Sequence, residues 1–289
     1  MSDMDRRTFL GTMAVAAVAG RSVGAASITN IGMQLYTVRT QIEKDFDGTL
    51  AKVAAIGYKE VEFAGYFNRT PQQVRDILKT TGLSSPSAHI GYDLLAADKW
   101  PAVLEAAHTI GHTFLVVAWI DPKVRAEPGI WKRVAETFNR AGEASKKAGI
   151  QFAYHNHQFE FAPVDGKLPY DQLLEDCDPA LVTMELDLCW IAAAGKDPLD
   201  YFKRSPGRFP MVHVKGLSKL TPGGAATPID QLLPLITDVG SNGDVIDWKK
   251  IFADSSEAGI KHYFVEHDTT KAPFDSLAAS YKYLKALQF

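Results

Sequence analysis

Short apolar runs alternate along the chain with longer stretches in which apolar residues recur at helical spacing. Such runs, rich in β-branched and aromatic residues, are typical of buried strands. They predict strands at residues 31–36, 58–63, 83–90, 112–119, 149–153, 182–187, 209–215 and 262–267. The helical spacing predicts helices near residues 46–57, 71–78, 101–110, 130–149, 170–177, 198–203, 248–258 and 274–287.

These elements form eight strand-then-helix units. Strands that alternate with helices pair in parallel, and eight units over roughly 260 residues fit a single (β/α)8 TIM barrel, which is an α/β fold. A doubly wound open sheet is the alternative, but no Gly-x-Gly-x-x-Gly pattern follows the first strand. Residues 216–246 form a long polar loop with several glycines and prolines, where a further element could be inserted.

The first 26 residues have the pattern of an export signal. Paired arginines, Arg6 and Arg7, precede a mildly apolar stretch at residues 11–20, and small residues follow at 24–26. This order is typical of a signal peptide, and the arginine pair followed by Thr-Phe-Leu resembles a twin-arginine signal. We therefore expect a signal at residues 1–26 and a mature barrel at residues 27–289 that is periplasmic or secreted. The apolar stretch is shorter than the ~20 residues that span a bilayer, so we expect no stable membrane insertion after cleavage.

The composition is that of an ordinary globular protein. The chain has 289 residues, of which 46% are hydrophobic and 22% are charged, and its net charge is −3. No long basic run is present, which argues against nucleic acid as a partner. The two cysteines, Cys177 and Cys189, exclude a disulfide framework, and we expect ordinary buried thiols.

Polar side chains cluster where the last four predicted strands end, which is where TIM barrels carry their functional groups. His155 and His157 lie two residues apart, so they point to the same side of the fifth strand. Asp187, His213 and Glu266 belong to the next three strands. We expect these ends to converge on one divalent metal ion. A mixed nitrogen and oxygen set with two carboxylates suits manganese, zinc, cobalt or iron better than calcium.

Several stretches resemble the xylose-isomerase-like sugar phosphate isomerase/epimerase superfamily, across about residues 30–289. They are Tyr154-His155-Asn156-His157 with Phe159-Glu160-Phe161, Glu185-Leu186-Asp187-Leu188-Cys189-Trp190, His213-Val214-Lys215, and Phe264-Val265-Glu266-His267. The resemblance implies one divalent ion, manganese first with magnesium as a further alternative. It implies Glu, Asp, His and Glu ligands at the ends of strands five to eight. Asp187, His213 and Glu266 match the last three.

The first ligand departs from that pattern, because His155 stands where a glutamate is usual and His157 is a second candidate. In the epimerases, the glutamate missing here is one of two acid/base residues. A proton transfer across both faces of a carbon then needs another partner, for which Glu160, His157 and Glu185 are candidates. The Tyr-His-x-His run also resembles that of inosose dehydratase, a member that eliminates water.

These residues predict an enzyme. A metal that holds a carbonyl and its neighbouring hydroxyl makes the α-proton removable, with Glu266 as the first candidate base. We expect an isomerase or epimerase of an unphosphorylated sugar or keto-sugar, acting through an enediolate. The alternative is a lyase that eliminates from a keto-sugar or 3-keto-glycoside. Other classes left open are a non-catalytic sugar-binding barrel and, against the charge and the signal, a nuclease.

Further side chains near the strand ends are candidates for substrate binding, and a homo-oligomer is compatible with the chain. These candidates are His89, Glu62, Trp119, Trp190 and Lys215. Each has a plainer interpretation. The histidines could be buried structural residues, the tryptophans could pack a lid, and Asp187 could cap the next helix.

Overall fold

A computed structural model describes residues 26–289, so the expected signal at residues 1–26 lies almost wholly outside the described residues. Within the described part, no helix combines the length and apolar character that a membrane span requires. The first described residue lies beside the last, since the Ala26 N–H donates to the Phe289 carbonyl at 2.7 Å.

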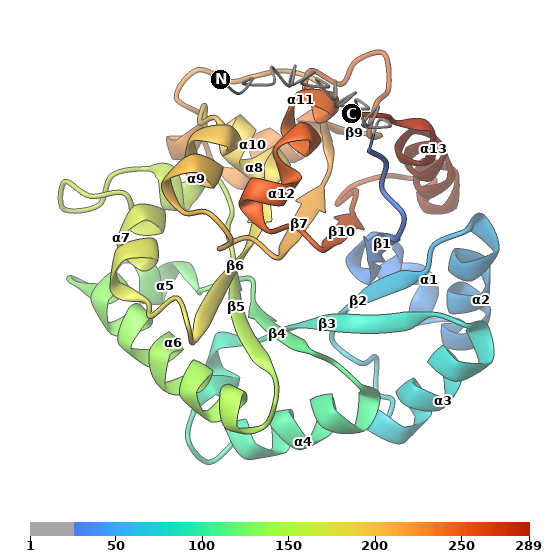
Figure 1. Ribbon diagram of the computed structural model, residues 1–289, viewed down its shortest axis with the longest axis horizontal. Coiled ribbons are helices and arrows are strands. Elements are labelled where there is room, and N and C mark those ends of the chain that lie inside the picture. The colour runs from blue at the N-terminus through green and yellow to red at the C-terminus, as the bar shows by residue number, and fades with distance from the viewer. Residues whose placement is uncertain (1–25) are drawn as a thin grey trace, which may run out of the picture.

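Eight parallel strands close into a barrel, as the sequence predicts (Figure 1). The strand order around the barrel is β1-β2-β3-β4-β5-β6-β7-β10. The strands are Ile31–Gln34 (β1), Glu60–Ala64 (β2), Ser84–Ile90 (β3), Phe114–Val117 (β4), Gln151–His155 (β5), Val182–Asp187 (β6), Met211–Val214 (β7) and His262–Val265 (β10). The barrel register aligns His155 with Glu185, and Asp187 with His213, so these side chains come from neighbouring strand ends.

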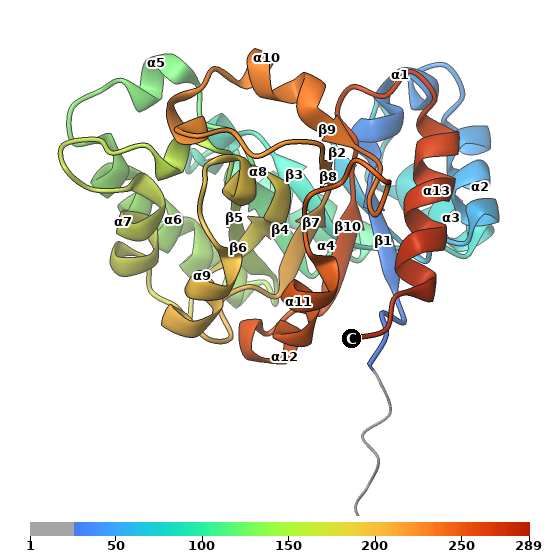
Figure 2. The same cartoon turned by 90° about the horizontal axis from the view of Figure 1, so that it is seen from above.

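Helices surround the barrel (Figures 1 and 2). They are Arg39–Ile42 (α1), Phe46–Ile56 (α2), Pro71–Thr81 (α3), Trp100–Ile110 (α4), Pro122–Arg125 (α5), Ile130–Lys147 (α6), Pro169–Asp176 (α7), Leu188–Ala193 (α8), Pro198–Arg204 (α9), Ile229–Leu232 (α10), Trp248–Ala253 (α11), Ser255–Ala258 (α12) and Pro273–Ala286 (α13). The longer helices match the predicted ones. The short helices α1, α5, α8 and α10 were not predicted, because segments of four to six residues carry too little periodicity.

Helix α3 illustrates how the sequence sets an element's limits. Thr70 and Gln73 form a capping box, and Pro71 occupies the first turn, where its missing N–H costs nothing. The helix ends at Gly82, whose φ of 69° lies in the left-handed region that glycine adopts without strain. Similar signals delimit most of the helices that the sequence predicts.

The long segment after β7 is folded, not an irregular loop. Gly216–Leu217 (β8) pairs with Ile236–Thr237 (β9) in an antiparallel hairpin that contains α10. Its apolar residues form a small hydrophobic cluster with α8, separate from the main core; the cluster comprises Cys189, Trp190, Ala193, Leu217, Leu232 and Ile236. Cys177 and Cys189 are free and buried, as expected. The segment is therefore an inserted platform beside the mouth of the barrel.

Candidate active site

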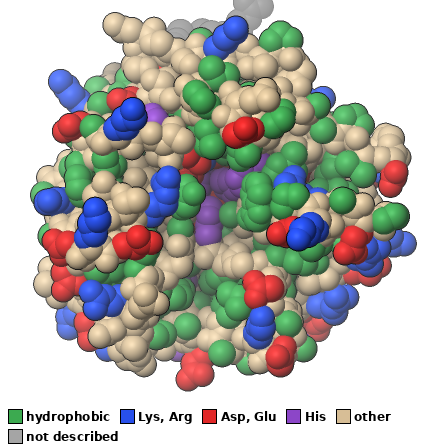
Figure 3. All heavy atoms as spheres, turned by 180° about the vertical axis from the view of Figure 1, so that it is seen from behind, with side chains coloured by type: hydrophobic (Ala, Val, Ile, Leu, Met, Phe, Trp, Pro, Cys, Tyr) green, Lys and Arg blue, Asp and Glu red, His purple; other side chains and the backbone are tan. Residues whose placement is uncertain are grey.

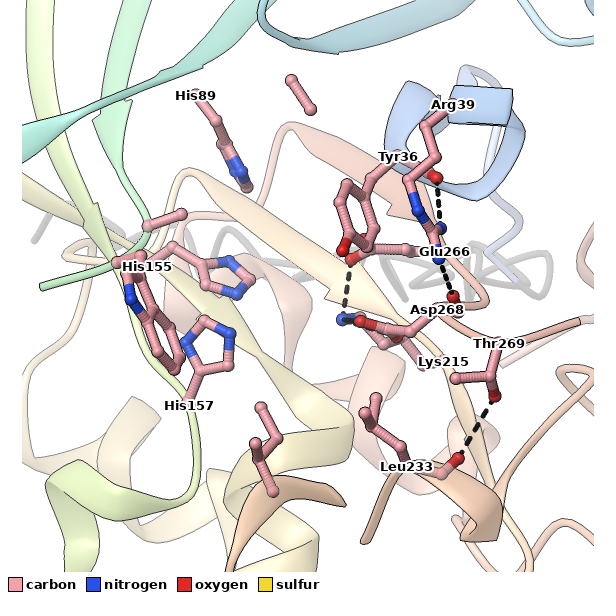
Figure 4. A pocket seen from close by; sticks show the side chains of 14 residues that line it. Tyr36, Arg39, His89, His155, His157, Lys215, Leu233, Glu266, Asp268 and Thr269 are labelled. Carbon is pink, nitrogen blue, oxygen red and sulfur yellow. Dashed lines mark hydrogen bonds and ion pairs between the residues drawn. The ribbon is translucent and has the colours of Figure 1, made fainter. Parts of the chain in front are cut away.

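A pocket of about 460 Å³ opens at the carboxyl ends of the barrel strands. Figure 3 shows histidine side chains in a central hollow of this face, with hydrophobic side chains around it. The pocket is lined by Tyr36, Arg39, Ala64, His89, Ala118, Trp119, His155, His157, Lys215, Ile229, Leu233, Glu266, Asp268 and Thr269 (Figure 4). This volume is within the range of ~300–1,000 Å³ typical of small-molecule sites.

The four predicted metal ligands converge below this pocket. His155 Nε2 lies 3.8 Å from Asp187 Oδ2, and His213 Nδ1 lies 3.9 Å from the same oxygen. His213 Nδ1 is also 2.8 Å from Glu266 Oε2. Asp187 and His213 are completely buried, whereas His155 and Glu266 reach the pocket wall. We call these four residues the upper cluster.

The far nitrogen of each imidazole in the upper cluster is held by a buried glutamate. His155 Nδ1 lies 3.1 Å from Glu185 Oε2, and His213 Nε2 lies 2.7 Å from Glu62 Oε2. Metal-binding histidines usually donate their second N–H to such a partner, which fixes the ring and its tautomer. This arrangement leaves His155 Nε2 and His213 Nδ1 free to face Asp187 and Glu266.

The upper cluster fits a divalent ion on two observations. Asp187 Oδ1 caps α8 by accepting from the Trp190 N–H at 2.7 Å, whereas Asp187 Oδ2 is buried, accepts no hydrogen bond and lies 3.1 Å from the Lys215 ammonium. Two atoms that bind one ion at ~2.1 Å are at most ~4.2 Å apart, so separations of 3.8 and 3.9 Å allow a shared ion. Asp187, His213 and Glu266 indeed form a group of donor atoms compact enough for a metal.

A second group of donors, the lower cluster, comprises Glu62 and Glu185, which lie one layer deeper, and His89, which also lines the pocket. His89 Nε2 is 2.7 Å from Glu185 Oε2 and 3.0 Å from Glu62 Oε2. Burial lowers the pKa of His89, but the two carboxylates outweigh it and raise that pKa to about 9. His89 and Glu185 also form, with His155 and His213 and without Glu62, a group of donor atoms compact enough for an ion. Glu185 Oε1 is a free acceptor in this group, but His89 Nε2 is engaged by both carboxylates, so the upper cluster is the better candidate for an ion.

Lys215 brings a positive charge to the opposite side of the upper cluster. Its Nζ lies 2.7 Å from Glu266 Oε2, 3.1 Å from Asp187 Oδ2 and 3.1 Å from Asp268 Oδ2. Burial lowers the pKa of Lys215, but the three carboxylates outweigh burial and raise it well above the ordinary value. Burial raises the pKa of Asp268 to about 6 despite the lysine. The side of the pocket formed by β7 and β10 is therefore ionic.

The side formed by β4 and β5 carries imidazole and aromatic rings instead. His157 stacks on Phe159 at 5.6 Å between ring centroids and meets Trp119 edge-on at 5.1 Å. Its Nδ1 is buried without a hydrogen-bond partner. Figure 4 shows His155 and His157 facing Glu266 and Lys215 across the pocket.

Comparison with known proteins identifies the fold family. The family model described as "Xylose isomerase-like TIM barrel" matches residues 50–287. The chain belongs to the xylose isomerase-like TIM barrel family. An inosose dehydratase from Geobacillus thermodenitrificans is 22% identical over 270 residues, which cover 84% of this chain and 90% of the relative. One from Clostridium tetani is 21% identical over 271 residues, with 84% and 90% coverage.

Solved structures show the same barrel. A sugar phosphate isomerase/epimerase from Parabacteroides distasonis superposes with a TM-score of 0.75 and 25% identity, covering 94% of this chain and 97% of that one. An IOLI protein with a bound zinc atom gives a TM-score of 0.68 at 13% identity, with 88% and 95% coverage. This chain is therefore similar both to proteins named as isomerases or epimerases and to proteins named as dehydratases.

Besides the buried ligand candidates Asp187 and His213, three residues predicted to act on or bind substrate do not line the pocket. Glu160 is fully buried, and its carboxylate accepts from the Tyr154 hydroxyl and from the His157 N–H. Glu62 lies in the lower cluster, where it accepts from Gln34 and contacts His213. The structure therefore corrects the expectation that Glu160 is catalytic and that Glu62 binds substrate, because both carboxylates are used to position other side chains.

Trp190 is the third of these residues. Its ring is completely buried beneath His157 and Lys215, at 5.8 Å from the His157 ring centroid and 5.3 Å from Lys215 Nζ. It supports the floor of the site and does not contact substrate space. By contrast, His89, Trp119, His157 and Lys215 line the pocket, as the sequence analysis expects of site residues.

Some residues that line the pocket were not predicted from the sequence. Tyr36 and Arg39 follow β1, and Ile229 and Leu233 come from the inserted platform. Asp268 follows Glu266 at the same strand parity, which could have pointed to it. The platform residues offered no such signal, because nothing in a long loop's sequence shows which of its apolar side chains turn toward the barrel.

Proposed function

We propose that this protein is a metal-dependent lyase that eliminates a β-substituent from a keto-sugar. The proposal is carried by the asymmetry of the pocket. An unpartnered imidazole, His157, faces an ionic wall of Glu266 and Lys215 on the other side. The similarity of the sequence to inosose dehydratases supports the same reaction class.

The upper cluster would hold a divalent ion through His155, Asp187, His213 and Glu266. When bound there, the ion supplies a Lewis acid that polarises the substrate carbonyl. Glu266 is a poor general base in this setting. Burial raises its pKa, but Lys215 and His213 outweigh that effect and lower it. Its Oε2 is already engaged by both cations. These contacts revise the base expected from sequence.

His157 is better placed to take the α-proton, because its ring lines the pocket and because burial and the Lys215 charge lower its pKa, which keeps the imidazole neutral and able to accept a proton. Glu160 fixes this ring's backbone by accepting the His157 N–H at 2.8 Å. Lys215, opposite, can donate a proton or a hydrogen bond to the departing oxygen. Elimination needs one group that accepts the α-proton and another that donates to the leaving oxygen, and His157 and Lys215 can fill these two roles.

Isomerisation or epimerisation is the second candidate, and the Parabacteroides structure, with its isomerase/epimerase name, favours it. Epimerisation requires acid/base groups on both faces of one carbon. Neither of the two carboxylates expected as a second partner, Glu160 and Glu185, lines the pocket. His157 and Glu266 would have to serve both faces. This requirement places elimination first.

The two functions separate in a product assay. The purified, metal-loaded enzyme is incubated in D₂O with keto-inositols and with keto-glycosides, and products are followed by ultraviolet absorbance and NMR. Elimination produces an unsaturated ketone with a new absorbance, whereas epimerisation leaves a saturated product that carries deuterium at the α-carbon. Deuterium without a new absorbance would establish the second candidate, and neither signal on any substrate would refute both.

Two variants connect the assay to the residues. His157→Gln should lower kcat by a factor of 10² or more, since general base catalysis contributes about 10²–10⁴-fold. His108→Gln is the matched control, because His108 is exposed on α4 and does not line the pocket. Equal activity of His157→Gln and the control would remove His157 from the reaction.

A further inference from the structure

Two aromatic side chains are unusually exposed at the mouth of the pocket. Tyr36 is 42% exposed and Trp119 is 40% exposed, and both line the pocket. No other aromatic side chain in the described part of the chain is among its exposed large hydrophobic residues. Tyr36 follows β1 and Trp119 follows β4, so the two rings come from well-separated parts of the barrel rim. Water-exposed aromatic faces at a pocket indicate a stacking surface for a ligand ring.

The inserted platform adds an apolar wall to this mouth. Ile229 and Leu233 line the pocket and pack against the platform's hydrophobic cluster. Asp244 fixes the platform, because its carboxylate accepts from the backbone N–H groups of Leu217, Gly240 and Ile246 and from Trp248 Nε1. Thr227 also ties it to the loop after β5, by accepting from Gln158 Nε2 at 3.1 Å. The wall is therefore preformed, which lowers the entropy cost of binding.

Two guanidinium groups lie against the aromatic rings at the mouth, and the Arg125 guanidinium is 4.9 Å from the Trp119 ring centroid. The Arg39 guanidinium lies 4.0 Å over the Tyr36 ring and donates to the carbonyls of Tyr36 and Asp268. The acids that line the pocket, Glu266 and Asp268, are paired with Lys215. Apart from these charged groups, the mouth offers aromatic ring surface and aliphatic carbon, which suit an apolar or aromatic ring.

We propose that the mouth is a second subsite that binds an apolar or aromatic ring attached to the keto-sugar, so that the substrate is a glycoside with a ring aglycone. This inference rests on the proposed function for the reacting sugar. The α C–H bond breaks, its electron pair forms a C=C bond, and the C–O bond to the aglycone breaks on the β-carbon. The aglycone oxygen takes a proton and leaves as an alcohol or phenol.

The subsite is tested with ligands that cannot react. Phenyl and methyl glucosides, in both anomeric forms, lack the carbonyl and differ only in the ring. Calorimetric titration of the metal-loaded wild type should show the phenyl glucoside of at least one anomer binding about tenfold more tightly than its methyl counterpart, from ring stacking and burial. Equal affinities for both pairs, or no phenyl glucoside binding at millimolar concentration, would overturn the subsite.

Variants locate the preference at the mouth. Trp119→Ala should bring the affinity ratio close to one, and Trp119→Phe should restore most of it. Leu220→Ala is the control, because Leu220 is 55% exposed on the same inserted segment but does not line the pocket. A ratio that persists in Trp119→Ala would overturn the assignment to this ring.

The two proposals fail separately. A wild type that prefers phenyl glucosides but converts no keto-sugar would refute the lyase and leave the subsite. A wild type that eliminates from free keto-sugars but shows no ring preference would refute the subsite and leave the lyase.

Discussion

Replacing Glu160 with glutamine should change how the stability of the protein depends on pH. Glu160 is completely buried, and burial raises its pKa to about 7 from an ordinary 4.5, although the Tyr154 hydroxyl and the His157 N–H donate to it. Between these two pH values the folded state binds more protons than the unfolded state. The free energy of unfolding therefore falls as pH rises from about 4.5 to about 7, and this contribution is lost above about pH 7.

The size follows from the shift. At about 1.36 kcal/mol per pKa unit, the charged carboxylate destabilises the folded protein by about 3 kcal/mol at pH 8 relative to pH 4. Glutamine cannot ionise, and like the protonated acid it offers one carbonyl oxygen as acceptor beside a donor group, here an NH₂. Glu160→Gln should therefore match wild type near pH 4.5 and exceed its stability by about 3 kcal/mol at pH 8.

Urea unfolding of both proteins at pH 4.5, 6, 7 and 8, followed by far-UV circular dichroism, measures this difference. The informative quantity is the difference in unfolding free energy between variant and wild type at each pH. The contributions of the other titrating groups are the same in both proteins and cancel in this difference. A gap that stays constant across the series would refute the reasoning that Glu160 titrates near neutrality in the folded state.

Three other outcomes are expected. His112 lies buried with a pKa that burial lowers to about 4, so wild type should lose stability as pH falls from 6.5 to 4, and His112→Gln should remove about 3 kcal/mol of that loss in acid unfolding curves. Gly57 has φ +123° and a Cβ there would lie 2.6 Å from the Tyr281 ring, so Gly57→Ala should cost about 1–3 kcal/mol more in urea unfolding than Gly111→Ala, where no atom is in the way. Asn156 accepts from the Asp187 N–H at 2.9 Å, so Asn156→Ala should weaken metal binding about 10- to 100-fold in chelator competition, while unchanged affinity would deny it a positioning role.

The fold could be predicted from the sequence because its signal is repeated. Eight apolar runs separated by capped helices leave few topologies, and a parallel barrel satisfies all of them. The inserted hairpin at residues 216–246 could not be predicted, since β8 and β9 are two residues each and their partners lie far apart in sequence. The predicted strand boundaries lie close to the observed ones because the strands are buried almost throughout and therefore stand out as continuous apolar runs.

The site could be predicted only in part. The convergence of His155, Asp187, His213 and Glu266 could be predicted because side chains at the carboxyl ends of neighbouring strands lie close together, whereas their role as metal ligands stays a prediction. However, the alternation of side chains along a strand shows which face each one points to and does not show how deeply it is buried. Glu160 occupies a one-turn 3-10 helix that turns its carboxylate back toward Tyr154, and Glu62 lies one layer below the pocket. Whether a polar side chain faces substrate or supports another residue depends on packing that a sequence does not display.

The most direct test of the account is the metal content of the purified protein, wild type beside His155→Ala and Asp187→Ala, with His262→Ala as control. His262 lies at the opposite, amino-terminal end of its strand, paired with Glu60. Elemental analysis should find about one divalent ion per chain in wild type and control, and far less in the two site variants. Wild-type protein prepared without chelators that holds no stoichiometric metal, or variants that retain it, would contradict the assignment of the upper cluster as a metal site.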